Sequence, residues 1–155
     1  MVVREAMTKD PITIDPEARL GTALDAMRSG KLRHLPVVDE AGQLVGIITD
    51  RDLRQAVLAP ALDEYLSARD RRRFHRLGET FENLRVKDAM TWGVATTHPN
   101  ASLAHAALIM FERRVGSLPV IVEGRLVGIL TERDVLLALS SGKSVRQFNP
   151  EGFLW

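Results

Sequence analysis

The residues with the clearest chemical potential lie in two short, matching stretches. The first reads Thr-Asp-Arg-Asp from Thr49 to Asp52, and the second reads Thr-Glu-Arg-Asp from Thr131 to Asp134. Each follows an apolar run, so each predicts a strand that turns directly into a helix. A threonine followed three residues later by an acidic residue is also the signature of a capping box, in which the two side chains satisfy free backbone N–H groups.

Two further residues in each stretch are not needed for a cap. An arginine, Arg51 or Arg133, precedes the aspartate, and a glycine, Gly46 or Gly128, opens the strand. A carboxylate at a helix start can accept hydrogen bonds from a ribose diol, and a neighbouring guanidinium can bind phosphate with a fork of donors. We therefore predict a pair of ribose-phosphate sites related by an internal symmetry, in preference to two isolated caps.

These stretches belong to a longer duplication. The segment from Val3 to Thr8 matches the segment from Val86 to Thr91 position by position, as valine, base, acid and Ala-Met-Thr, and the same shift continues into the later strands. Ala41 has no counterpart, so the second copy is one residue shorter at a turn, where such a loss is tolerated. We predict repeats at residues 1–58 and 84–140.

Each repeat has the pattern strand, helix, strand, strand, helix. In the first copy, residues 11–16 are rich in β-branched side chains and predict a short strand, and the apolar spacing over residues 20–30 predicts a helix. Residues 35–38 and 44–49 flank a turn and predict a hairpin. One unit alone buries little apolar surface, so we expect a mixed α/β (α+β) fold. In it, two β-α-β-β-α repeats pack about a pseudo-twofold axis, with a shared ligand in the cleft between them.

The repeated motifs resemble those of a tandem pair of CBS (cystathionine β-synthase) domains. The motifs are Val-x-Asp/Glu-Ala-Met-Thr, a strand that ends at Pro16 or Pro99, Leu-Pro-Val-Val/Ile, and Gly-Ile-Ile/Leu-Thr-x-Arg-Asp, and they recur in order over roughly residues 1–58 and 84–140. The resemblance implies a Bateman module, which is a regulatory unit that binds adenosine-containing ligands and is not an enzyme.

The resemblance also implies roles for individual residues. In that family the threonine and aspartate of the last motif hold the ribose, which corresponds to Thr49, Asp52, Thr131 and Asp134. The adenine lies against the first strand and the strand before the last helix. The corresponding residues are Ile12, Thr13 and Ile47 in the first copy and Ala95, Thr96 and Ile129 in the second. The candidate phosphate residues are Arg33, His34, Arg51, Arg133 and Arg114.

The second copy departs from this pattern near the phosphate. Gly116-Ser117 takes the place of Arg33-His34, although arginines lie just upstream, so we expect the two sites to differ in phosphate affinity. By resemblance we expect AMP, ADP or ATP as ligand, with or without Mg²⁺, ahead of S-adenosylmethionine. No cofactor is required, and the expected partners are a second copy of the chain and an effector protein.

Composition argues against several other classes of function. The net charge of +1 provides no global field that selects nucleic acid or an anionic membrane, and the absence of cysteine excludes disulfides and thiol chemistry. The start of the chain lacks a signal-peptide pattern, and no apolar run approaches the roughly 18 residues of a membrane span. No catalytic motif occurs either. We expect a cytoplasmic, non-enzymatic protein.

Two segments lie outside the repeats. Helical spacing of apolar residues predicts a helical insertion at 59–83, and aromatic residues there and in the tail, 141–155, predict that the two pack together or on a second subunit. The basic cluster Arg69–Arg76 could bind RNA, but the balanced charge favours a solvated helix face. The alternatives to a nucleotide sensor are therefore a dimerisation scaffold that binds no nucleotide and, behind it, an RNA-binding protein.

Overall fold

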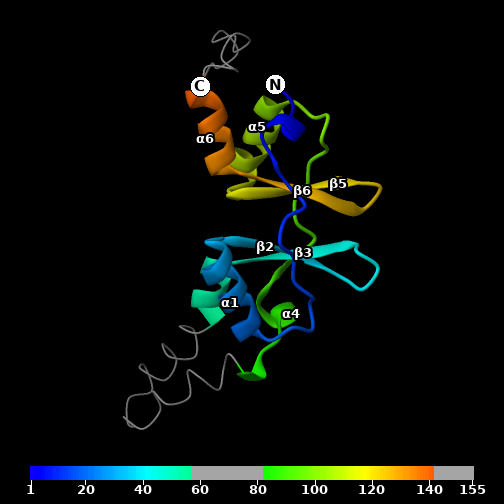
Figure 1. The fold of residues 1–155 in the computed structure, drawn as a ribbon, viewed down its shortest axis with the longest axis vertical. Coiled ribbons are helices and arrows are strands. Elements are labelled where there is room, and N and C mark those ends of the chain that lie inside the picture. The colour runs from blue at the N-terminus through cyan, green and yellow to red at the C-terminus, as the bar shows by residue number, and fades with distance from the viewer. Residues whose placement is uncertain (57–81, 142–155) are drawn as a thin grey trace. The chain divides into compact units, whose positions relative to one another are not determined.

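The structure of the chain, a computed structural model, describes residues 1–56 and 82–141. These residues divide into two compact units (Figure 1). Unit 1 contains residues 1–9, 95–122 and 127–141, and unit 2 contains residues 10–56, 82–94 and 123–126. Almost all of the predicted insertion and tail lies outside the described residues, and so does the basic cluster Arg69–Arg76.

Unit 2 is built on a three-stranded antiparallel sheet covered by helices. The strand order is β2-β3-β4, from β2 (His34–Val38), β3 (Leu44–Thr49) and β4 (Thr91–Trp92). Helices α1 (Leu20–Gly30) and α4 (Val86–Ala89) lie on one face of this sheet (Figure 1), and residues 50–56 are also helical. The predicted helix and hairpin of the first repeat are both present.

Unit 1 repeats this arrangement. Its sheet has the order β1-β6-β5, from β1 (Thr8–Lys9), β6 (Arg125–Thr131) and β5 (Ser117–Val122). Helices α5 (Leu103–Arg113) and α6 (Glu132–Ser140) cover one face, and a short 3-10 helix, η1 (Val3–Glu5), precedes β1. The second hairpin turns at Glu123 and Gly124, whose φ angles of 50° and 80° give the left-handed backbone of a tight turn. The predicted mixed α/β fold with two similar units is confirmed.

The predicted first strand at residues 11–16 is wrong in its length. Only Ile14 pairs, in an isolated parallel bridge with Val37, and Thr97 makes the equivalent bridge with Val120. Pairing stops after Ile14 because a turn follows at once, in which the Ala18 N–H donates to the Asp15 carbonyl oxygen. Proline 16 lies within this turn and has no N–H to extend a ladder.

The segments that open the two sequence repeats pack with the opposite repeat. The Val3 N–H donates to the Ala101 carbonyl oxygen at 2.9 Å, so the first segment lies in unit 1. The Val86 N–H donates to the Ala18 carbonyl oxygen at 2.8 Å, so the second segment lies in unit 2. Sequence repeats and compact units therefore do not coincide at these two segments.

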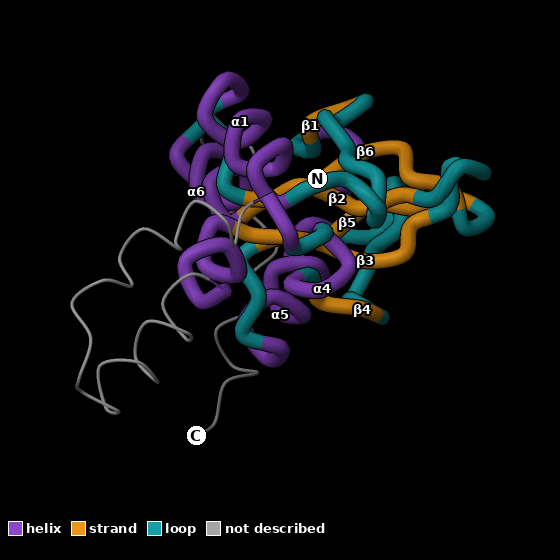
Figure 2. Tube along the Cα trace, turned by 90° about the horizontal axis from the view of Figure 1, so that it is seen from below, coloured by secondary structure: helices purple, strands orange, loops and turns teal. Residues whose placement is uncertain are grey.

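Each opening segment ends in an edge strand that runs close to a glycine. Strand β1 pairs with β6, and β4 pairs with β3 (Figure 2). A Cβ atom on Gly46 would lie 2.5 Å from the Thr91 carbonyl oxygen, and one on Gly128 would lie 2.9 Å from the Thr8 carbonyl oxygen. Both glycines lie inside their strands and not at the strand starts that the sequence predicted. The close approach of the edge strands gives them a structural reason, and they no longer argue for a ligand.

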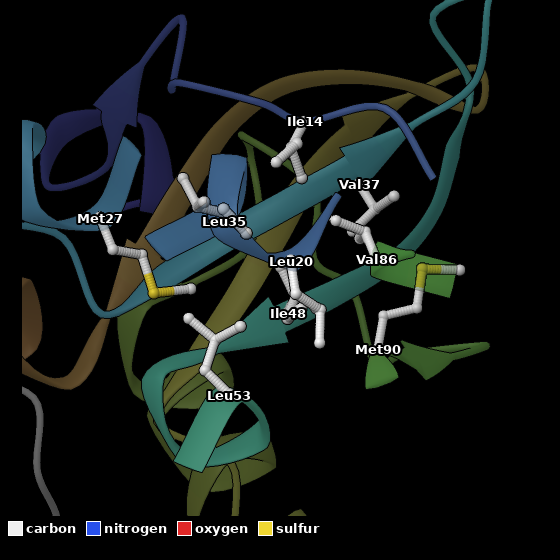
Figure 3. Packing of buried hydrophobic residues seen from close by; sticks show 10 residues of the cluster. Ile14, Leu20, Met27, Leu35, Val37, Ile48, Leu53, Val86 and Met90 are labelled. Atoms are coloured by element: carbon white, nitrogen blue, oxygen red, sulfur yellow. The ribbon is translucent and has the colours of Figure 1, made fainter. Parts of the chain in front are cut away.

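The apolar core of unit 2 lies between its helices and its sheet (Figure 3). Leu20 and Met27 face it from α1, and Leu35 and Ile48 face it from the strands. Val86 contributes from the opening segment and is fully buried. Unit 1 has an equivalent core, formed by Val3, Leu103, Ala106, Met110, Leu118, Val120, Leu130 and Ala138. Within the described residues, no helix has the length and apolar content needed to cross a membrane.

Candidate functional site

The threonine and aspartate of each predicted ribose site form a reciprocal capping box. In unit 2 the Thr49 hydroxyl donates to Asp52 Oδ2 at 2.7 Å, and the Thr49 N–H donates to the same oxygen at 2.8 Å. The Asp52 N–H in turn donates to Thr49 Oγ1 at 3.2 Å. Thr131 and Asp134 repeat these bonds at 2.7, 2.8 and 3.3 Å. The capping interpretation of these residues is therefore correct as a description of the local structure.

The box fixes the aspartate without using its whole carboxylate. Both hydrogen bonds that Asp52 accepts inside the box end on Oδ2, and the same is true of Asp134. The box does not use Oδ1, and both aspartates are only half-buried. A carboxylate oxygen that is oriented but not consumed by the cap is suited to accept a hydrogen bond from a hydroxyl group of a ligand.

Next to the box of unit 2, two arginines converge on one carboxylate. Arg33 Nε lies 3.4 Å from Asp50 Oδ2, and an Arg54 guanidinium nitrogen lies 3.0 Å from the same oxygen. The Asp50 N–H donates to the Arg33 carbonyl oxygen, which fixes this backbone against the start of the helix. The side chains of Arg33 and Arg54 are 74% and 65% exposed, so an anion in solution can reach both of them.

Unit 1 has the same backbone arrangement without these side chains. The Glu132 N–H donates to the Gly116 carbonyl oxygen at 3.0 Å, which reproduces the bond between Asp50 and Arg33. The position of Arg33 is therefore held by Gly116, which has no side chain. The position of Arg54 is held by Leu136, which is 65% exposed.

The predicted adenine residues of unit 2 lie at the end of the sheet that carries the box. Because Ile14 pairs in parallel with Val37, the chain two residues earlier places Ile12 level with the start of β2, where His34 is opposite Thr49. Ile12 is 52% exposed, unusually so for a large apolar side chain, and Thr13 is exposed as well.

Ile47 lies in the neighbouring strand and is buried, yet it is not part of the core cluster that contains Ile48. Successive residues of a strand point to opposite faces, so Ile47 lies on the sheet face away from the helices. Ile129 has the same relation to Leu130 in unit 1. Ala95 and Thr96 are half-buried and precede the bridge at Thr97, so they occupy the places of Ile12 and Thr13.

The remaining predicted phosphate residues are less closely tied to the boxes. Arg51 and Arg133 are exposed in the first turn of their helices, where the helix dipole disfavours a positive charge. Arg114 caps the C-terminus of α5 with a left-handed φ of 54°, as Lys31 caps α1 with 52°. Sequence reasoning missed Asp50 and Arg54, although their i, i+4 spacing on a helix is a recognisable signal for an ion pair.

His34 is half-buried in β2. Among the residues that the structure describes, no group of three or more histidines and carboxylates is arranged to hold a metal ion.

A family model of the CBS domain matches residues 3–59 and 86–141, which is most of the chain. The chain belongs to the CBS domain family. A CBS domain-containing protein of Dictyostelium discoideum is 36% identical over 138 residues, which are 88% of this chain and 89% of that protein. An inosine-5'-monophosphate dehydrogenase of Methanocaldococcus jannaschii is 33% identical over 133 residues, which are 85% of this chain but only 22% of that enzyme. CBS domains thus occur both in stand-alone proteins and as parts of larger ones.

Solved CBS domain pairs share the fold. CBSX2 of Arabidopsis thaliana in complex with AMP matches with a TM-score of 0.72 and 28% identity, and the match covers 92% of this chain and 98% of that one. The CBS domain pair of protein MJ0100, in complex with 5'-methylthioadenosine and S-adenosyl-L-methionine, matches with the same TM-score, identity and coverage. Both of these CBS pairs were therefore solved with adenosine-containing ligands.

Proposed function

We propose that this CBS domain pair is a regulatory module that binds an adenine nucleotide, namely AMP, ADP or ATP, and acts by favouring one conformation or assembly of the protein. The residues proposed to hold the ribose are Thr49, Asp52, Thr131 and Asp134. A ligand can bias such an equilibrium only through its differential affinity for the two states, so the module needs an effector protein or self-assembly to produce an output.

The observation that carries this proposal is the identical Thr-Asp box in both units. Each box orients a half-buried aspartate and leaves its Oδ1 outside the capping bonds. In unit 2 an exposed isoleucine, Ile12, and an exposed arginine, Arg33, lie at the same end of the sheet. Apolar surface for a base, a carboxylate oxygen for a ribose and a guanidinium for a phosphate are the groups that a nucleotide requires.

Thermal unfolding with and without nucleotide tests the proposal. AMP or ATP at 100 times its Kd should add about 2.7 kcal/mol of stability, which raises Tm by about 5 to 10 °C in a chain of this size. Asp52→Asn and Asp134→Asn are the sharpest variants, because the amide oxygen can still accept both bonds of the box while the second carboxylate oxygen becomes an N–H donor. The double variant should remove the whole rise.

Thr49→Ser is the matched control, because it keeps the hydroxyl and should keep the nucleotide-dependent rise. A rise that survives in the double asparagine variant would contradict the assignment of the ribose site. No rise in the wild-type protein with AMP, ADP, ATP or S-adenosylmethionine would favour the dimerisation scaffold. The capping bonds account for Thr49 and Asp52 without a ligand, which is the observation in favour of that alternative.

We also propose that the chain forms a homodimer, as its family resemblance implies. Helices α5 and α6 contact each other and expose five large apolar side chains, which are Leu108, Phe111, Leu136, Leu137 and Leu139. Phe111 is 81% exposed, whereas the matching position in α1 is Arg28. Exposed apolar side chains of this size are typical of an interface. Phe111→Glu should lower the mass measured by sedimentation from dimer to monomer, and a monomeric wild-type protein would refute the homodimer.

A further inference from the structure

The two candidate nucleotide sites differ most where the 5' end of the ligand would lie. In unit 2, Asp50 holds Arg33 at 3.4 Å and Arg54 at 3.0 Å, so two guanidinium groups converge beside the box. In unit 1 the same backbone positions carry Gly116 and Leu136, so neither guanidinium has a counterpart. The backbone bond that fixes this region is the same in both units, so the difference lies in side chains alone.

The upstream bases compensate for this difference only in part. Arg114 in unit 1 is equivalent to Lys31 in unit 2, and both cap a helix in the left-handed conformation. Both are exposed. A positive charge at this position is therefore common to the two units. Unit 1 has one further exposed base, Arg113, at the place of Gly30, so Arg33 and Arg54 leave unit 2 with an excess of one guanidinium group. Glu132, at the place of Asp50, has no ion pair among the described residues, so no arginine is paired with its carboxylate as Arg33 and Arg54 are with Asp50.

We propose that the two sites select ligands by the charge of the 5' substituent. The site of unit 2 binds an adenosine with a 5'-phosphate group, and the site of unit 1 binds an adenosine whose 5' substituent carries no negative charge. This inference rests on the proposed function, since it needs both boxes to hold a ribose. The physical basis is that a phosphate gains charge-assisted hydrogen bonds from Arg33 and Arg54, but in unit 1 it meets Glu132 and an apolar Leu136.

Isothermal titration calorimetry on the full chain tests the proposal, with AMP and 5'-methylthioadenosine as probes. The wild-type protein should bind one AMP per chain tightly, and protein saturated with AMP should still take up one 5'-methylthioadenosine per chain. Arg33→Gly combined with Arg54→Leu, which copies the residues of unit 1, should weaken AMP binding by about tenfold or more. The uptake of 5'-methylthioadenosine at the other site should not change.

The reciprocal variant is Gly116→Arg. Gly116 is not one of the described glycines with a positive φ angle, which are Gly42, Gly93 and Gly124. An arginine at position 116 therefore needs no left-handed backbone. This variant should bind a second AMP per chain. The double variant that lacks Arg33 and Arg54 should have nearly the same Tm without ligand as the wild-type protein, because both side chains are mostly exposed. An unchanged Tm is the check that this double variant is folded.

Three results would overturn the inference. Two AMP molecules bound with equal affinity by the wild-type chain would show that Arg33 and Arg54 do not discriminate. Unchanged AMP affinity in the variant that lacks both arginines would show the same, as would a Gly116→Arg chain that binds no second AMP. These results leave the proposed function intact. If neither AMP nor 5'-methylthioadenosine binds to any variant, the proposed function itself fails and the inference fails with it.

Discussion

Replacing Gly46 by alanine tests why a glycine lies within the strand before the first Thr-Asp box. The new Cβ would lie 2.5 Å from the Thr91 carbonyl oxygen, whereas ordinary contact begins at 3.4 Å. Strands β3 and β4 would have to separate by roughly 0.9 Å, and β4 is only two residues long. We expect a loss of about 2 kcal/mol in the free energy of unfolding, within the range of overpacked sites. Gly128→Ala should cost less, about 1 kcal/mol, because its Cβ would lie farther from the edge-strand carbonyl, at 2.9 Å from the Thr8 oxygen, and its closest contact at 2.7 Å is the flexible Met7 side chain.

Urea unfolding measures the loss of free energy in both variants, provided that the slope m is the same as in the wild-type protein. Trp92 lies in β4 opposite Gly46, so its fluorescence in a Trp155→Phe background reports whether β4 leaves the sheet. Gly42→Ala is the control for backbone strain. Its Cβ would meet no atom within 4 Å, but its φ is 76°. We expect about 1 kcal/mol from the left-handed conformation and an unchanged Trp92 signal.

The reasoning would be refuted if Gly46→Ala changed the free energy of unfolding by less than about 0.5 kcal/mol, which is the size of an ordinary surface substitution. If the variant kept this stability but lost its nucleotide-dependent rise in Tm, the glycine would be required by the ligand rather than by the approach of β4. The opposite outcome, lost stability and a displaced Trp92, would confirm the packing explanation.

The other predictions concern the cap and the opening segment. Thr131→Val removes the hydroxyl of the box and should cost about 1 kcal/mol in urea unfolding, whereas Thr131→Ser should stay within about 0.5 kcal/mol; equal losses would show that the box does not stabilise α6. Val86→Ala creates a cavity in the core of unit 2 and should cost about 2 kcal/mol. The side chain of its neighbour Lys87 forms an exposed ion pair with Glu17, so Lys87→Ala should change stability by less than about 0.5 kcal/mol. A larger loss for Lys87→Ala than for Val86→Ala would contradict the packing.

The features that depend on neighbours within a few residues could be predicted from the sequence. The boxes at Thr49 and Thr131 follow from Thr-x-x-Asp before an apolar run, and the hairpin turns follow from Gly42 and Gly124. The duplication also located the candidate site residues, because a motif that occurs twice in the same order is specific. The first strand was predicted too long, since the periodicity did not reveal the turn that follows Ile14.

Contacts between distant segments were decided by the tertiary structure alone. Thr8 pairs with Ile129, and Val86 is buried beside Leu20, although the two opening segments carry the same motif. Identical motifs cannot specify which copy they pack against, because the partner of an edge strand is set by the path of the chain and by the packing of the whole unit. The same limit applies to the ion pair of Arg33 with Asp50, which depends on a strand start and a helix that only folding brings together, whereas the pair of Arg54 with Asp50 lies within one helix.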